Sequence, residues 1–212
     1  MNNLLKLPPL SLYIHYPWCI KKCPYCDFNS HEGEIQSGYI NALLSDLDDD
    51  LKYVQNRKIN SIFIGGGTPS LMSINDLNDL FNGLSNRLVF SPDIEITMEA
   101  NPGTFEIDKF SEFRNVGVNR LSIGVQSFDD NQLKFLGRIH SAKEAKNAVI
   151  KAQKVGFDNL NIDLMYGLNR QSIDECMIDI TSAITLNPSC LLYTSDAADE
   201  GLGVDLGGRR II

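Results

Sequence analysis

Short apolar runs alternate with longer segments of helical periodicity along most of the chain, and this alternation limits its fold more than any other feature. Residues that favour strands gather in five runs, at 10–14, 59–64, 94–98, 121–125 and 160–165. Apolar residues at helical spacing follow each run, most extensively over 34–54, 141–155 and 172–186. Repeated strand–helix units indicate parallel strands joined by right-handed crossovers.

Polar residues stand at one end of every predicted strand, and they separate the two folds that share this pattern, the doubly wound sheet and the (β/α) barrel. In barrels the chemistry lies at the carboxyl ends of the strands. Here those ends carry Tyr13 and His15, the segment 65–68, Glu99 and Asn101, Gln126, and Asp163. We therefore predict an α/β fold, a partial (β/α) barrel of parallel strands with five of the six βα units present.

Three cysteines directly follow the first strand, with the spacing Cys19-x3-Cys23-x2-Cys26. Three thiolates on one short loop can converge on a single metal centre. Structural zinc sites normally have four ligands and iron–sulfur clusters commonly have four cysteines, so a cluster held by three would keep one iron open. The spacing alone leaves two sites open: an iron–sulfur cluster, or zinc with His15 or His31 as the fourth ligand. His15 is more simply interpreted as a hydrogen-bonded core histidine.

Three further segments carry residues suited to binding a cofactor, each with a plainer alternative. The glycines of the segment 65–70 let the backbone approach a ligand, although they equally suit a tight turn. Glu99 could hold an ammonium group or ribose hydroxyls, or form a structural ion pair with Arg120. Arg138 could bind a carboxylate with two hydrogen bonds, or lie at a solvated helix end.

The composition suits one soluble globular domain that does not bind nucleic acid. The chain has 212 residues, 43% of them hydrophobic, and a net charge of −8, which argues against a nucleic-acid surface. No apolar stretch approaches the length of a membrane span, and the first residues lack the basic and apolar regions of a signal peptide. We expect a cytoplasmic protein.

Taken together, the motifs resemble the branch of radical S-adenosylmethionine proteins related to oxygen-independent coproporphyrinogen III oxidase, and within it the HemW-type haem chaperones. The resemblance covers residues 10–189. The segments that carry it are Tyr-Ile-His-Tyr-Pro-Trp-Cys at 13–19, Cys-Pro-Tyr-Cys-Asp-Phe at 23–28, Gly-Gly-Gly-Thr-Pro-Ser at 65–70, Glu-Ala-Asn-Pro-Gly at 99–103, Arg-Leu-Ser-Ile-Gly-Val-Gln-Ser at 120–127, Leu-Gly-Arg-Ile-His at 136–140 and Asn-Ile-Asp-Leu-Met-Tyr-Gly at 161–167.

This resemblance implies a 4Fe-4S cluster ligated by Cys19, Cys23 and Cys26, whose open iron binds S-adenosylmethionine. The residues it implies for the S-adenosylmethionine site are Tyr13, Tyr25, Gly66, Gly67, Thr68, Glu99, Gln126, Arg138 and Asp163. The implied partners are haem or porphyrin, an electron donor for the cluster, and haem-acceptor proteins, a membrane protein among the candidates for a transient contact.

Two features favour the haem chaperone over an oxidase that decarboxylates porphyrin side chains. The oxidases of this branch carry a fourth cysteine two residues after the third, where this chain has Phe28. They also have a longer N-terminal extension, whereas the first strand here begins about ten residues in. A zinc-stabilised binding module is the third hypothesis.

The Gly-rich string from Cys190 to Ile212 departs from the pattern of the preceding chain, and we interpret it as translated sequencing adapter. On this interpretation residues 1–189 are the truncated core barrel, residues 190–212 are a non-native tail, and the family's C-terminal domain, with the haem site, is missing. We then expect the tail to add nothing to the fold, leaving the strand at 160–165 as an uncovered sheet edge.

Overall fold

The computed structural model describes residues 7–103 and 107–195. Its centre is a six-stranded sheet in which all neighbouring strands are parallel. The strands stand in chain order: β1 (Leu10–Tyr16), β4 (Ile59–Gly66), β5 (Phe90–Ala100), β6 (Arg120–Gln126), β7 (Asn159–Tyr166) and β8 (Cys190–Ser195). Two short strands, β2 (Trp18–Cys19) and β3 (His31–Glu32), pair with each other beside this sheet.

Helices connect the strands of the large sheet. They are α1 (Tyr39–Val54), the 3-10 turn η1 (Pro69–Leu71), α2 (Ile74–Ser85), α4 (Phe110–Val116), α5 (Asp130–Phe135), α6 (Ala142–Lys154) and α7 (Ile173–Thr185). None of the helices in the described residues is both long enough and apolar enough to span a bilayer.

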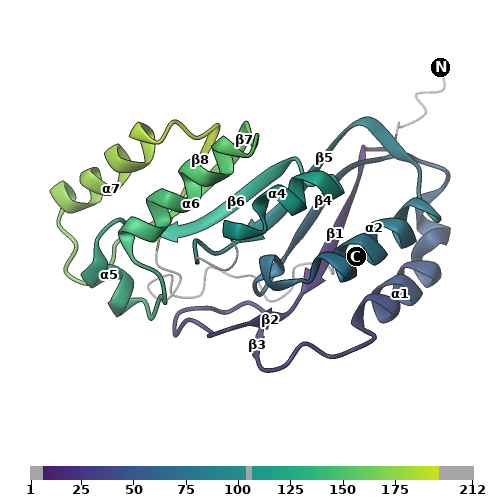
Figure 1. The fold of residues 1–212 in the computed structure, drawn as a ribbon, viewed down its shortest axis with the longest axis horizontal. Coiled ribbons are helices and arrows are strands. Elements are labelled where there is room, and N and C mark those ends of the chain that lie inside the picture. The colour runs from purple at the N-terminus through teal and green to yellow at the C-terminus, as the bar shows by residue number, and fades with distance from the viewer. Residues whose placement is uncertain (1–6, 104–106, 196–212) are drawn as a thin grey trace, which may run out of the picture.

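The unreversed strand order identifies the kind of α/β fold. Right-handed crossovers between successive neighbouring strands place all connecting helices on one face, whereas a doubly wound sheet needs a reversal of strand order. Figure 1 shows α1, α2, α4, α6 and α7 ranged along the sheet. β1 and β8 form its two edges. The predicted partial (β/α) barrel is confirmed, with five βα units followed by a sixth strand.

Alternate residues of each strand face the helices and form the core. In β1 the side chains of Leu12, Ile14 and Tyr16 pack into the main hydrophobic cluster, whereas Tyr13 and His15 alternate with them and lie on the opposite, concave face. The concave face is therefore free to carry polar side chains while the helices cover the apolar one.

Serine caps fix where three of the helices begin. Ser73 accepts a hydrogen bond from the backbone of Asp76 and starts α2. Reciprocal capping boxes start α6 and α7, through Ser141 with Glu144 and through Ser172 with Glu175.

Two predicted elements have different bounds in the structure. The helix expected over 34–54 begins at Tyr39, because Gly38 has a left-handed φ of 84° that a helix interior does not accept. The strand expected over 94–98 extends over Phe90–Ala100, and an irregularity in its pairing with β4 between Ile59 and Ser61 accommodates the additional residues.

The expectation of an uncovered edge at 160–165 is wrong. Residues 190–195 form β8, which pairs in parallel with β7 from Asn161 to Tyr166. Leu191 and Tyr193 of β8 pack against the main core, so this part of the string contributes to the fold. The foreign origin of residues 190–212 and the missing C-terminal domain remain predictions, and residues 196–212 lie outside the described part of the chain.

Candidate functional site

The predicted site residues converge at the carboxyl ends of the strands, beside the cysteine loop, which we define as residues 17–31. One pocket is lined by all of them except Tyr13: Cys19, Cys23, Tyr25, Cys26, Gly66, Gly67, Thr68, Glu99, Gln126, Arg138 and Asp163. The pocket and its open mouth contain about 690 Å³ free of protein atoms.

The glycine segment joins the cysteine loop to the sheet. The backbone N–H groups of Gly67 and Thr68 donate to the carbonyl groups of Tyr16 and Trp18, at 2.7 and 2.8 Å. A Cβ atom on Gly67 would lie 2.7 Å from the backbone of Pro17 and Trp18. Glycine is therefore required here for the close approach of two backbones, a role that neither a ligand contact nor a plain turn describes.

The cysteine loop is closed mainly by its own hydrogen bonds. The backbone N–H of His31 donates to Pro17 at 2.8 Å, and that of Cys26 donates to Cys23 at 3.0 Å. The Lys22 ammonium donates to the carbonyl groups of Phe28 and Ser30, at 3.0 and 3.1 Å. Lys22 thus holds the returning half of the loop against the outgoing half.

The three cysteine thiols are half-buried, and each lies near a hydrogen-bond donor. Thr68 Oγ1 lies 3.5 Å from Cys19 Sγ, and Arg138 Nη1 lies 3.4 Å from Cys23 Sγ. Cys26 Sγ lies 3.9 Å from the Ser30 hydroxyl. In the described residues no three His, Cys, Asp or Glu side chains lie close enough together to hold one metal ion. The three thiols nevertheless share one pocket.

The chemistry of this donor set fits an iron–sulfur cluster better than zinc with a histidine ligand. Soft thiolates suit both metals. Neither His15 nor His31 lines the pocket, however. The two ring nitrogens of His15 already have partners, the hydroxyl of Tyr13 at 2.9 Å and the carbonyl of Asn29 at 2.8 Å. Because neither histidine lines the pocket, the three thiols have no histidine beside them that could serve as a fourth ligand.

Glu99 lies on the sheet side of the pocket, where its Oε2 accepts a hydrogen bond from the backbone N–H of Gly66 at 3.1 Å. Burial raises the pKa of the Glu99 carboxyl to about 7, the bond from Gly66 opposes the rise, and nearby Asp163 adds to it. The alternative of an ion pair with Arg120 is wrong, because Arg120 instead donates to the Thr97 hydroxyl at 3.3 Å.

Asp163 is held by two side chains that the sequence did not single out. The hydroxyl of Ser122 donates to it at 3.1 Å, and the amide of Asn161 donates at 2.6 Å. Burial raises the pKa of Asp163, and these two hydrogen bonds oppose the rise. Asn161 could have been found from its place two residues before Asp163 on the same strand face, and Ser122 is its neighbour across the pairing of β6 and β7.

Arg138 is built into the pocket, so the alternative of a solvated helix end is wrong. Its Nη2 donates to Asn101 Oδ1 and to the carbonyl of Gly124, the latter at 2.7 Å. Its Nε is buried and has no hydrogen-bond partner within the described residues. Asn101 in turn donates from Nδ2 to Thr68 Oγ1 at 3.2 Å. Asn101 stood in the predicted strand-end set but not among the predicted cofactor residues.

Gln126 lines the pocket directly before a turn that Asp179, a residue far along the sequence, stabilises by hydrogen bonds. Its φ of 70° lies in the left-handed region, which is strained for a glutamine. Directly after it, the hydroxyl of Ser127 and the backbone N–H of Phe128 both donate to the buried carboxyl of Asp179 on α7, each at 2.7 Å. Burial raises the pKa of Asp179. No local signal in the sequence points to this contact.

The two predicted tyrosines have different surroundings. Tyr25 lines the pocket and packs against a small cluster formed by Leu136, Met165 and Leu168, and burial raises the pKa of its hydroxyl. Tyr13 is 49% exposed and stacks on Phe63 along the concave face, outside the pocket lining. Tyr13 thus lies beside the pocket and not in its lining, where burial and then the charge of nearby Glu99 raise the pKa of its hydroxyl.

The protein class follows from comparing the chain with known families. The model of the radical SAM superfamily matches residues 13–180. The chain therefore belongs to the radical SAM superfamily.

Particular relatives narrow the resemblance further. The chain is 55% identical over 193 residues to the heme chaperone HemW of Escherichia coli strain K12, which covers 90% of this chain and 51% of that protein. It is 36% identical over 180 residues to the heme chaperone HemW of Bacillus subtilis strain 168, covering 84% and 48%. The chain spans about half the length of the curated relatives it matches.

A solved structure of coproporphyrinogen III oxidase (HemN) from Escherichia coli, described as a radical SAM enzyme, has the same fold. It superposes with a TM-score of 0.77 at 30% identity, covering 89% of this chain and 44% of that one. The predicted resemblance to this branch of the superfamily is confirmed.

Proposed function

We propose that this chain is the radical-SAM part of a haem chaperone that binds a 4Fe-4S cluster and S-adenosylmethionine. The observation that carries the proposal is the convergence of three thiols, a guanidinium and half-buried carboxyl groups in one pocket, in a chain 55% identical to a heme chaperone. We propose that a C-terminal domain completes the haem site, and that haem passes from the whole protein to acceptor proteins in the cytoplasm.

Cys19, Cys23 and Cys26 would hold the cluster. Held by these thiols, a cluster would supply the redox chemistry of the site, the transfer of an electron to the sulfonium of S-adenosylmethionine. We call the side of the pocket formed by the ends of β4, β5, β6 and β7 the sheet wall. The Arg138 guanidinium lies beside Cys23, between the thiols and this wall. Its fixed positive charge suits a cofactor carboxylate there.

Glu99 would bind the positive or hydroxyl-bearing part of the cofactor. With a pKa of about 7, its carboxyl is ionised above neutral pH and protonated below it. The ionised form accepts hydrogen bonds from an ammonium group or from ribose hydroxyls. Binding of S-adenosylmethionine should therefore strengthen as the pH rises through 7.

Phe28 favours the chaperone over the oxidase. Its side chain lines the pocket and is 64% exposed. A phenyl ring offers neither a thiol nor a hydrogen bond with which to fix a substrate propionate beside the cofactor. An exposed apolar ring at an open mouth suits the passage of a macrocycle to a partner better than the shelter of a radical from water.

The test uses the full-length protein, reconstituted anaerobically with iron and sulfide. We expect visible and paramagnetic spectra of an iron–sulfur cluster, and haem binding in a spectral titration. Incubation with coproporphyrinogen III, S-adenosylmethionine and a reductant should yield no protoporphyrinogen IX by chromatography. The E. coli coproporphyrinogen III oxidase, run in parallel, serves as the positive control.

Each alternative has a distinct signature in this experiment. Steady accumulation of the decarboxylated porphyrin would replace the chaperone assignment by the oxidase. Retention of zinc without an iron spectrum would instead support the zinc-stabilised module.

A further inference from the structure

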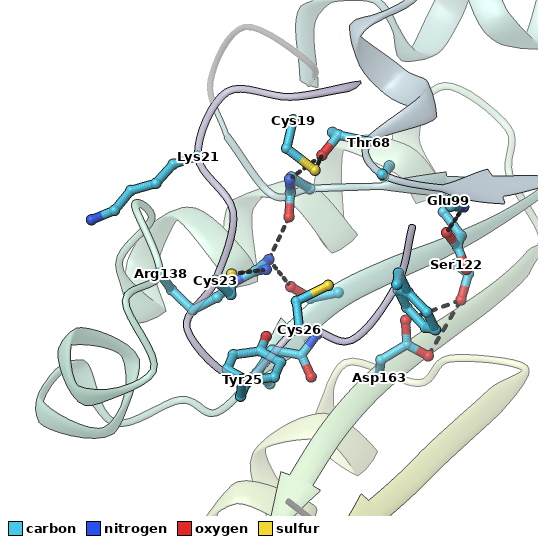
Figure 2. Close-up of a pocket in the computed structure, with 17 residues that line it drawn as sticks. Cys19, Lys21, Cys23, Tyr25, Cys26, Thr68, Glu99, Ser122, Arg138 and Asp163 are labelled. Atoms are coloured by element: carbon cyan, nitrogen blue, oxygen red, sulfur yellow. Dashed lines mark hydrogen bonds between the residues drawn. The ribbon is translucent and has the colours of Figure 1, made fainter. Parts of the chain in front are cut away.

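A continuous chain of side-chain hydrogen bonds crosses the pocket from one cysteine to another. It runs from Cys23 to Arg138, from Arg138 to Asn101, from Asn101 to Thr68, and from Thr68 to Cys19. Figure 2 shows Arg138 beside Cys23 on the left, with Cys19 and Thr68 above them and to the right. This series of hydrogen bonds links two of the three proposed cluster ligands, Cys23 and Cys19, by way of the sheet wall.

The chemistry of Arg138 fixes the direction of every bond in this chain. A guanidinium only donates, so Asn101 must present Oδ1 to it. The Asn101 amide nitrogen then faces Thr68 and donates to Oγ1 at 3.2 Å. The Thr68 hydroxyl, having accepted that bond, is left with its own proton for Cys19 Sγ at 3.5 Å.

The surroundings of Thr68 leave its hydroxyl little freedom to turn elsewhere. Thr68 is 4% exposed, and its backbone N–H is bound to the carbonyl of Trp18, one residue before Cys19. The Thr68 hydroxyl and the Cys19 thiol are therefore held together by the backbone as well as by their own contact. Only the proton of the hydroxyl remains to be oriented, and Asn101 orients it.

We propose that Asn101 is a positioning residue that aims the Thr68 hydroxyl at Cys19 and thereby raises the reduction potential of the cluster. This inference rests on the proposed function, because it needs a cluster on the three cysteines. Hydrogen bonds to ligand sulfurs stabilise the more negative, reduced cluster and are among the factors that set its potential. The three thiols are unequal in this respect. Cys19 and Cys23 belong to the chain of hydrogen bonds, whereas the Cys26 thiol makes a longer contact, 3.9 Å to the Ser30 hydroxyl.

The test measures the midpoint potential of the reconstituted full chain by redox titration, followed through the paramagnetic signal of the reduced cluster. Thr68→Val removes the hydroxyl while keeping the size of the side chain, and should shift the potential to more negative values. Thr68→Ser keeps a hydroxyl and should leave the potential at the wild-type value. Ser30→Ala removes the contact to Cys26 and should produce a smaller shift than Thr68→Val.

Asn101→Asp tests the orienting role directly. An aspartate accepts from both Arg138 and Thr68, so the Thr68 proton turns away from Cys19, and the added negative charge lowers the potential as well. In the Thr68→Val background only the charge effect remains. The shift caused by Asn101→Asp should therefore be smaller in that background than in the wild-type chain.

Several results would overturn the proposal. Equal potentials for Thr68→Val and the wild type would do so, and so would strictly additive effects of the two substitutions. If Asn101→Asp does not fold, Asn101→Ala decides, because a wild-type potential in that variant contradicts an orienting role. A wild-type chain that takes up no iron would refute the proposed function and this inference with it, whereas a cluster with unchanged potentials would refute the inference alone.

Discussion

The two walls of the pocket are built in different ways. The sheet wall is formed by the carboxyl ends of four strands. The helix-facing residues of these strands are fully buried in the core, among them Ile64, Met98, Ile123 and Leu164. The cysteine loop has exposed apolar side chains and is closed by its own hydrogen bonds, which include those of Lys22. The core thus positions the sheet wall directly. It holds the cysteine loop only at Trp18, and the part of the loop that carries the thiols beyond this residue is positioned by hydrogen bonds and by its contacts with the sheet wall.

This difference separates ligand chemistry from stability. Thiols on the loop contribute little to the buried core, so changing them should affect metal binding far more than folding. Side chains on the sheet wall are embedded in the fold, so changing them should affect both. The three predictions that follow test this separation on the loop, on the sheet wall and at the joint between them. By the joint we mean the backbone contact of Gly67 and Thr68 with residues 16–18.

The largest expected effect is on the loop. Replacing Cys19, Cys23 or Cys26 by alanine should abolish the iron–sulfur absorption and paramagnetic signal after anaerobic reconstitution, while the melting temperature of the metal-free chain changes little. Cys176→Ala is the matched control, because Cys176 lies on α7 and contacts Tyr193, away from the pocket. The three-thiol site would be refuted if Cys176 proved as necessary as the others.

The second prediction concerns Glu99 on the sheet wall. Its pKa is raised from an ordinary value of 4.5 to about 7, so the folded chain binds this proton more tightly than the unfolded chain does. The contribution to stability is therefore complete below about pH 4.5, declines as the pH rises, and is lost above about pH 7, a change on the order of 3 kcal/mol.

Glu99→Gln should flatten this decline, because glutamine stays neutral and its amide oxygen still accepts from Gly66. Urea unfolding at a series of pH values between 4 and 8 measures the effect. Glu112→Gln, which changes an exposed glutamate on α4, should keep the wild-type profile. An unchanged slope in Glu99→Gln would show that the sheet wall is less coupled to the fold than we infer.

The smallest effect is expected at the joint between the walls. Gly67→Ala forces the loop and the glycine segment apart, since the new Cβ would lie 2.7 Å from backbone atoms that a side-chain rotation cannot move. We expect a loss of about 1–3 kcal/mol in the free energy of unfolding, together with lower iron uptake.

Gly38→Ala is the control for the joint. Gly38 has a φ of 84°, but a Cβ atom added to it would meet no other atom within 4 Å, so alanine there brings backbone strain without a steric contact. Its iron uptake should equal that of the wild-type chain. Equal uptake in Gly67→Ala would mean that the loop finds its position without the joint.

The fold could be predicted from the sequence because its signals are local. Apolar runs, helical spacing and serine caps such as Ser73 identify the elements, and polar strand ends identify the face that carries the site. The irregular start of β5 could not be predicted, because it depends on how β5 pairs with β4. The prediction of a foreign string gives no place in the fold to residues 190–195, although Leu191 and Tyr193 supply the alternation that a strand requires.

The candidate site was predictable in membership but not in its connections. Motif positions located most of the residues that line the pocket. They did not single out Ser122 or assign Asn101 to the cofactor, and Tyr13 alternates onto a part of the concave face outside the lining. The contacts of Asp179 with Ser127 and of Arg138 with Cys23 join residues 52 and 115 positions apart. Such pairs depend on the complete path of the backbone, which no local pattern of residue types encodes.

The long separation between Cys23 and Arg138 also sets an order in time. A ribosome makes about 5–20 residues per second, N-terminus first, so the 115 residues that separate the two take roughly ten seconds to synthesise. During that interval the thiols have left the ribosome while the guanidinium beside them does not yet exist. If the three thiols hold a cluster, as we propose, iron and sulfide can enter a pocket that contains the guanidinium only after Arg138 has been made, and until then the nascent chain presents the thiols without it.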